Sequence, residues 1–341
     1  MSNDYSLAVV IPCWNCESYI GAMMDCLIHQ TFDDWMAFLI DDGCTDGTGE
    51  IIKTYSAKDQ RINYIKRNRG PKGAPTCRNI GFDMTEGAKY VIFLDADDLI
   101  APFCFEQRVR MMENAVDADF ISFPSKAFQE DPYDKLRWGF GIKGCQETLL
   151  SLLNWRTLSI VVCTNIYKRD SLVAKGLVWD ERLLSMQDSD FNIQAFCKGL
   201  RHEFASDARI DYFYRHLPDS VSKKVFEKEH YESHLYLIGK EVSSIQTAFG
   251  NKYDFFLKSY IVVFFELFKK DRWPYKQLLK QLFVKQNPCF ALRLFVYFIL
   301  GLKGKKHLFK PYCQYNEKSV EAWKTCVASR LNAMLMQSQL E

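Results

Sequence analysis

Two aspartates, Asp95 and Asp97, come directly after the apolar run 90–94 (YVIFL). In extended chain, residues two apart point to the same side, so both carboxylates can approach one cation. Mg²⁺ and Mn²⁺ take oxygen ligands in proteins, usually one or two carboxylates together with water and substrate phosphates. An Asp-x-Asp pair alone is more often a solvated turn. Its position after a buried strand shifts the interpretation toward a site for a metal and a diphosphate.

Two more polar clusters end apolar runs. Pro12-Cys13-Trp14-Asn15 follows the run 7–11 (LAVVI), and Asp41-Asp42 follows the run 36–40 (MAFLI). The ring of Trp14 can stack on a base or a ribose, or it can pack under the helix that follows. Farther along, Arg78 comes after a Gly/Pro-rich loop, 68–75, whose neighbourhood also supplies Arg67, Arg69 and Lys72. Such a loop suits an anionic diphosphate, and a plain solvated basic loop is the alternative.

Alternating strands and helices must position these clusters. The apolar runs predict strands over 7–11, 36–40, 62–65 and 90–94, and helical segments are expected over 19–30, from residue 45 or 46 to 55, and from about 76. Four alternations are typical of a parallel sheet, whose ligands lie beyond the carboxyl ends of the strands. The chain therefore predicts an α/β fold of the Rossmann type, with the polar clusters gathered at one sheet edge.

Four blocks of the sequence together resemble the signatures of family 2 glycosyltransferases with the GT-A fold. They are LAVVIPCWN (7–15), IDDGCTDGT (40–48), Arg78-Asn79-x-Gly81 and FLDADD (93–98), and their order and spacing match over roughly residues 5–220. The resemblance implies a mixed, mainly parallel sheet flanked by helices. It also implies an inverting enzyme that depends on a nucleotide sugar and on Mn²⁺ or Mg²⁺.

The same resemblance implies roles for the donor-side residues. Pro12, Trp14 and Asn15 would line the nucleotide pocket, and Asp42 would accept the imide N–H of a uracil, with Asp41 supporting the loop. A carboxylate acceptor favours a base with a ring N–H, hence uridine over adenosine, while guanosine and thymidine stay open. Arg78 would reach the diphosphate, although its preceding loop is longer than the family pattern. Asp97 would bind the metal, with Asp95 on the ribose or metal side.

On the acceptor side, the segment ending in Gln187-Asp188-Ser189-Asp190 is similar to the family block that ends in Glu-Asp before a helix. That match makes Asp188 the base that takes the proton of the acceptor hydroxyl. Without it, Asp188 and Asp190 would be acids that favour the N-terminus of a helix over 191–198. The segment 212–220 is similar to the family's closing strand and tail. There Arg215 or His216 folds over the diphosphate, and His216 is an additional candidate metal ligand, with a surface loop as the alternative.

Charge divides the chain into unlike parts. Residues 1–222 carry 24 basic and 32 acidic side chains, whereas residues 223–341 carry 20 and 10, so the net charge of +2 conceals −8 and +10. We expect a catalytic domain over 1–222, with a nucleotide-sugar part (1–124) and an acceptor-side part (125–222), and a helical, basic region over 223–341. Within that region, 289–302 is too short and too charged to span a bilayer.

The basic residues that follow it, interleaved with aromatics up to 312, suit the surface of an anionic membrane. A helical subdomain packed on the core or on a second copy is the alternative, and oligomeric state is left open. No nucleic-acid partner is expected, because the basic residues lack a recognised binding fold. The acidic start does not resemble a secretory signal, which favours a location in the reducing cytosol. The 12 cysteines lack zinc spacing and are expected to be buried thiols. Peripheral attachment to the inner face of the membrane is an additional expectation.

The expected reaction is transfer of a sugar from a nucleotide diphosphate sugar, a UDP-sugar first, to a hydroxyl of a glycan or lipid-linked acceptor in cell-surface polysaccharide synthesis. A nucleotidyltransferase shares the sheet and the acidic metal site, but would need a Gly- and Lys/Arg-rich loop after the first strand, where Pro12-Cys13-Trp14-Asn15 stands. A sugar-nucleotide-binding scaffold without catalysis is the other alternative, and only Gln187, in place of the usual Glu, supports it.

Overall fold

The computed structural model describes residues 4–129, 132, 139–141, 148–152, 160–217, 228–255, 257, 318, 321 and 325. The predicted domain boundary at 222 and the predicted membrane segment 289–312 lie outside these residues. Among the described residues, no helix combines the length and the apolar character that a membrane crossing requires.

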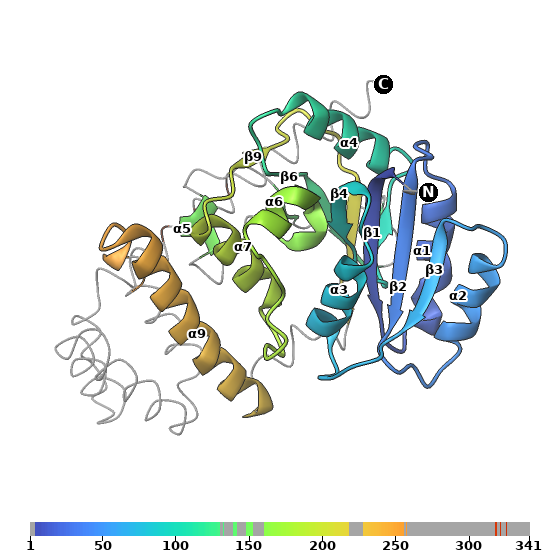
Figure 1. Cartoon of the computed structure of the whole chain (residues 1–341), viewed down its shortest axis with the longest axis horizontal. Coiled ribbons are helices and arrows are strands. Elements are labelled where there is room, and N and C mark those ends of the chain that lie inside the picture. The colour runs from blue at the N-terminus through green and yellow to red at the C-terminus, as the bar shows by residue number, and fades with distance from the viewer. Residues whose placement is uncertain are drawn as a thin grey trace.

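The first half of the chain alternates strands and helices as predicted (Figure 1). Its elements are β1 (Tyr5–Cys13), α1 (Glu17–Ile28), β2 (Trp35–Asp41), α2 (Thr48–Ser56), β3 (Ile62–Lys66), α3 (Ala74–Asp83), β4 (Ala88–Phe93), β5 (Leu99–Ile100) and α4 (Cys104–Asn114). The remaining described elements are β6 (Phe120–Ser122), β7 (Ser125–Phe128), α5 (Thr148–Leu152), the 3-10 helix η1 (Val162–Thr164), β8 (Asn165–Lys168), α6 (Arg169–Ala174), α7 (Gln187–Cys197), β9 (His202–Phe204), β10 (Tyr212–Arg215) and α9 (Lys228–Phe249).

Within the described residues, the main sheet has the strand order β3-β2-β1-β4-β8-β6-β9. The strands β3, β2, β1 and β4 run parallel to one another, whereas β8 runs antiparallel to both β4 and β6. A second sheet, β5-β10-β7, joins the segment after β4 to the end of the acceptor-side region. The predicted mixed, mainly parallel sheet is confirmed.

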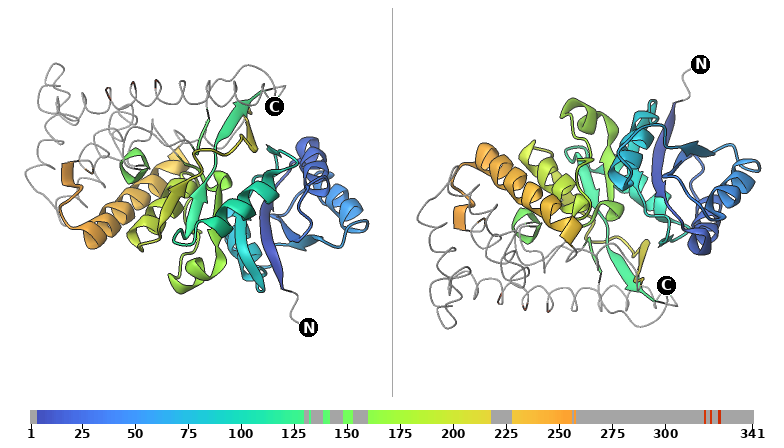
Figure 2. Two further views of the ribbon diagram at one scale, coloured as in Figure 1. Left: turned by 90° about the horizontal axis from the view of Figure 1, so that it is seen from above. Right: turned by 90° about the horizontal axis from the view of Figure 1, so that it is seen from below.

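Each face of the sheet packs against helices because side chains alternate along its strands. Leu7, Val9 and Ile11 of β1 point into a cluster that also holds buried residues of α1, α2 and α4. Ala8 and Val10 point into the opposite cluster, with residues of α3, α6, α7 and α9. Both views in Figure 2 show α9 alongside α7, so the described helix of the basic region packs on the acceptor side.

Candidate active site

The predicted polar clusters meet at one edge of the sheet, where β1, β2 and β4 all end. The backbone N–H of Asp42 donates to the carbonyl of Cys13 at 2.9 Å, and that of Leu94 donates to Val10 at 3.0 Å, which fixes the three strand ends side by side. Parallel pairing thus brings residues 12–15, 41–42 and 95–98 together, as the sequence predicted.

On the nucleotide side, Trp14 is 53% exposed, and the Nζ atom of Lys72 lies 4.5 Å from the centroid of its ring. The alternative in which Trp14 packs under the following helix is therefore wrong. Asn15 has a φ of 46°, and its Oδ1 accepts the backbone N–H of Thr45 at 2.9 Å, so it ties the loop after β1 to the loop after β2. Pro12, still within β1, pairs with Ile40 and is partly buried.

The two acids after β2 have different surroundings. Asp41 accepts the backbone N–H groups of Gly43 (2.9 Å) and Cys44 (2.7 Å), which supports the loop as expected. Burial alone would raise the pKa of Asp41, but these hydrogen bonds and one from the Tyr64 hydroxyl outweigh it and lower the pKa. Asp42 is buried, and its Oδ1 lies 2.5 Å from Nε of Arg67.

Arg78 connects the donor side to the acceptor side. Its Nη2 lies 2.6 Å from Oδ1 of Asp95, and its Nη1 lies 3.9 Å from Oδ1 of Asp188 and 3.2 Å from Oε1 of Gln187. The guanidinium also stacks over Trp179, 4.4 Å from the ring centroid. The Arg78 side chain is only 7% exposed. Its guanidinium, which we predicted to reach the diphosphate, is therefore largely buried and paired with Asp95.

Asp188 lies in the first turn of α7, and the backbone N–H of Val162 donates to its carboxylate. Burial raises the pKa of Asp188 to about 6; Arg78 opposes the rise and Asp95 adds to it. Asp190, in the same turn, is buried and pairs with Lys240 of α9 at 2.6 Å. The two acids of this helix start therefore differ: Asp190 serves packing, and Asp188 faces the site.

The acidic segment after β4 is held from the opposite side by β10. Asp98 is buried and accepts the hydroxyl of Tyr212 and the backbone N–H of Arg215, whose Nε donates to the carbonyl of Asp97 at 2.7 Å. Burial, and then the charge of Asp95, raise the pKa of Asp97 to about 6. In the described residues, ligand atoms of Asp95, Asp98 and Cys163 lie within 4.8 Å of one another.

Neither Asp97 nor His216 belongs to that group. The backbone N–H of His216 donates to Phe128 at 2.8 Å, at the end of β10, so its predicted role as a metal ligand stays a prediction.

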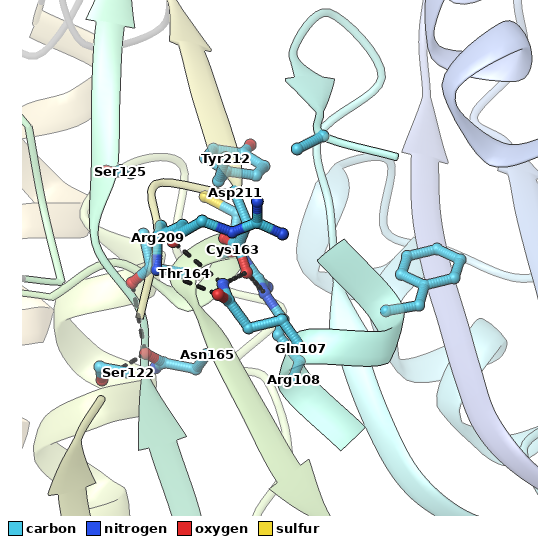
Figure 3. Close-up of polar contacts among 12 residues, drawn as sticks. Gln107, Arg108, Ser122, Ser125, Cys163, Thr164, Asn165, Arg209, Asp211 and Tyr212 are labelled. Carbon is cyan, nitrogen blue, oxygen red and sulfur yellow. Dashed lines mark hydrogen bonds and ion pairs between the residues drawn. The ribbon is translucent and has the colours of Figure 1, made fainter. Parts of the chain in front are cut away.

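Sequence reasoning missed a buried polar network next to the acidic segment 95–98 (Figure 3). Arg108 on α4 and Asp211 before β10 are both fully buried and form an ion pair of 2.8 Å, while Nη1 of Arg108 donates to the carbonyl of Cys163 at 2.9 Å. This network supports Cys163, whose thiol faces Asp95, and also Tyr212. Its partners are about a hundred positions apart in the chain and carry no motif.

A family described as Glycosyl transferase family 2 matches residues 8–174, which include Asp42, Arg78, Asp95 and Asp97. Residues 8–174 of the chain belong to glycosyl transferase family 2. The predicted family, and with it the enzyme class of a glycosyltransferase, is confirmed.

The chain is similar to two named relatives and to a crystal structure of one of them. The glycosyltransferase EpsJ of Bacillus subtilis is 27% identical over 64% of this chain and 63% of EpsJ. The poly(ribitol-phosphate) β-N-acetylglucosaminyltransferase TarS of Staphylococcus aureus is 25% identical over 69% of this chain and 40% of TarS. The crystal structure of TarS 1–349 in complex with UDP-GlcNAc superposes with a TM-score of 0.63, over 96% of this chain and 92% of that one, at 18% identity.

The mannosyltransferase PcManGT of Pyrobaculum calidifontis, in complex with GDP-Man and Mn²⁺, superposes with a TM-score of 0.50 at 13% identity, over 96% of this chain and 87% of that one. These structures confirm the predicted GT-A fold for this member of the family.

Proposed function

We propose that this family 2 member is a metal-dependent, inverting enzyme that transfers a sugar from a UDP-sugar to an acceptor hydroxyl. One observation carries the proposal. A carboxylate with a pKa raised to about 6, Asp188, lies at the sheet edge, 3.9 Å from the guanidinium that holds Asp95. A base and the donor-side acids at one edge are what a single displacement requires, because both substrates must meet there.

The nucleotide would bind between the loops after β1 and β2. The exposed ring of Trp14 offers a face for stacking, and the carboxylate of Asp42, whose Oδ1 contacts Arg67 and the N–H of Gly73, offers an acceptor for an imide N–H. TarS in complex with UDP-GlcNAc supports uridine, whereas PcManGT in complex with GDP-Man makes guanosine the first alternative to test.

The residues present fit a hard divalent cation. Asp98 already accepts two hydrogen bonds, and burial raises the pKa of the Cys163 thiol far above its usual range, so neither is a good ligand for Mn²⁺ or Mg²⁺. Asp97 and Asp95 would hold the ion together with donor phosphates, and His216 is proposed as an additional ligand. A cation bound there would neutralise charge on the leaving diphosphate.

The chain's own residues would then perform the proton transfer. Asp188 accepts the proton of the acceptor hydroxyl, whose oxygen forms a bond to the anomeric carbon as the bond to the diphosphate oxygen breaks. The electron pair leaves with UDP, and one displacement inverts the anomeric configuration. Arg78 keeps Asp95 and Asp188 at a fixed separation during this step.

For the acceptor we propose a glycan or lipid-linked saccharide of a cell-surface polysaccharide, built on the cytoplasmic side of the membrane. The printed name of TarS, which acts on poly(ribitol-phosphate), supports a surface polymer as acceptor. Peripheral membrane contact through 289–312 belongs to the same proposal.

The test combines UDP-, GDP- and dTDP-sugars with Mn²⁺ or EDTA, and measures the released nucleotide and the thermal shift. We expect UDP to be released from a UDP-sugar with Mn²⁺ only. Asp188→Asn should lower release by about 10²–10⁴-fold, the usual contribution of a general base, while the thermal shift by UDP persists. Asp170→Asn is the matched control, because Asp170 is also an acid in the first turn of a helix, α6, but its side chain is fully exposed. Release of sugar 1-phosphate, with UMP bonded to the acceptor, would instead indicate nucleotidyl transfer, and full activity of Asp188→Asn would refute the base.

A further inference from the structure

Helix α9 holds the segment that leads into the proposed base. The hydroxyl of Ser233 accepts the backbone N–H of Leu184 at 3.0 Å. One residue on, the hydroxyl of Ser185 lies 2.7 Å from Nε2 of His234 and 3.0 Å from Nδ1 of His230. All four side chains in these contacts are buried, so α9 fixes the backbone at 184–185 from inside the protein.

A second set of contacts lies on either side of this segment. Nζ of Lys240 is 2.6 Å from Oδ2 of Asp190 and 3.0 Å from Oδ2 of Asp180. The Asp190 side chain is 2% exposed and that of Asp180 is 8% exposed, and Tyr236 also donates to Asp180, at 2.7 Å. Buried carboxylates are costly unless they are paired. Lys240 is therefore the cation paired with Asp190, and it shares Asp180 with Arg182, whose Nε lies 2.9 Å from Oδ1 of that acid.

Between these contacts the backbone makes a turn that L-amino acids rarely adopt. Met186 has a φ of 58° and directly precedes α7, and its carbonyl accepts the N–H of Asp190 at 3.1 Å. Residues with a side chain hold such a conformation only where the surroundings impose it. Asp188 is two residues beyond this turn, so the direction of its carboxylate depends on it.

We propose that Lys240 is a positioning residue for glycosyl transfer. By binding Asp180 before the Met186 turn and Asp190 after it, Lys240 holds the first turn of α7 in the orientation that keeps Asp188 facing Arg78 and the donor edge. The inference rests on the proposed role of Asp188 as the base. It predicts an effect on kcat and not on donor affinity, because Trp14 and Asp42 are on other elements.

The test uses the full chain with Lys240→Met, which removes the charge and retains most of the length. We expect kcat for UDP release to fall at least tenfold, KM for the UDP-sugar to stay within twofold, and Lys240→Arg to recover most of the rate. Val242→Ala is the control, because Val242 is a buried apolar residue of α9 and its truncation destabilises the helix without touching the two acids. Thermal melts allow the two variants to be compared at equal loss of stability.

Lys240→Met with unchanged kcat, or a fall in kcat that Val242→Ala reproduces at equal loss of Tm, would overturn the proposal. Should the single variant fail to fold, Lys240→Met combined with Asp190→Asn removes the uncompensated carboxylate. Recovered folding with low kcat supports positioning, and recovered folding with normal kcat overturns it. Asp188→Asn in the same assay separates the two hypotheses: full activity there refutes the base, whereas an inactive Asp188→Asn beside a normal Lys240→Met refutes only the positioning role.

Discussion

At the scale of single residues, the protonation of Asp188 makes the site sensitive to pH. Burial raises the pKa of this carboxyl to about 6, against the opposing effect of Arg78. A base works only when it is ionised, so we expect kcat to rise about tenfold per pH unit below 6 and to become constant above about 7. The measurement is the initial rate of UDP release from pH 5 to 8 at saturating donor and Mn²⁺.

The pKa of Asp97 is also raised to about 6, so donor and metal binding should weaken over the same range of pH. Measuring at saturating donor and Mn²⁺ separates the effects of Asp97 and Asp188. Protonation of Asp97 raises KM, whereas protonation of Asp188 lowers kcat. A kcat that stays flat between pH 5 and 7 would contradict the assignment of Asp188. The Asp170 carboxylate is fully exposed, so the same titration of the Asp170→Asn variant should reproduce the wild-type profile.

Part of the site could be predicted residue by residue. Asp95 and Asp188 are about ninety positions apart; the residue pattern after a buried strand pointed to Asp95, the family resemblance pointed to Asp188, and Arg78 bridges the two in the structure. Cys163 and Asp211 could not be predicted, because a buried group that is satisfied by a distant partner leaves no local pattern. The contacts of Lys240 were missed for the same reason, although the helix that carries it was expected.

At the scale of elements, Gly81 sets how closely α3 approaches the sheet. A Cβ atom at this position would lie 2.4 Å from Cγ1 of Val10 and 3.3 Å from Cγ1 of Ile40, and both of these residues are fully buried. We expect Gly81→Ala to lower the free energy of unfolding by about 1–3 kcal/mol, the usual cost of overpacking, although alanine favours helix. Urea denaturation measures the change.

Gly21 on α1 is the matched control, since a Cβ there would meet nothing within 4 Å. Gly21→Ala should raise the free energy of unfolding by about 0.5–1 kcal/mol through helix propensity alone. Equal effects of the two substitutions would show that α3 can move away from β1, and that the position of Arg78 on it is less constrained than the packing indicates.

The elements themselves were predictable to different degrees. Continuous apolar runs predicted β1, β2 and β4, because strands buried on both faces need no polar side. The strands β6, β8 and β9 have three or four residues each, too short for a clear alternation, and their pairing depends on distant partners. The pairing of the second sheet, which positions Asp98 through β10, could not be predicted for the same reason, although the family resemblance indicated a strand at β10.

At the scale of the whole molecule, the Arg108–Asp211 pair joins α4, packed on the main sheet, to the start of the second sheet. Both side chains are fully buried, and Gln107 adds a hydrogen bond to Asp211 at 3.1 Å. We expect Arg108→Met to lower the free energy of unfolding by about 3–5 kcal/mol, because it leaves Asp211 buried without its cation. The measurement is urea denaturation followed by circular dichroism.

The double variant Arg108→Met/Asp211→Leu tests whether the stability of the fold requires the two charges of this ion pair. Two apolar side chains of similar size remove both charges, so most of the lost stability should return. The N–H groups of Gln107 and the carbonyl of Cys163 then lose a partner, which makes recovery incomplete. A double variant as unstable as Arg108→Met alone would contradict this account, and would mean that the junction between the two sheets depends on the hydrogen bonds of the pair more than on its charge balance.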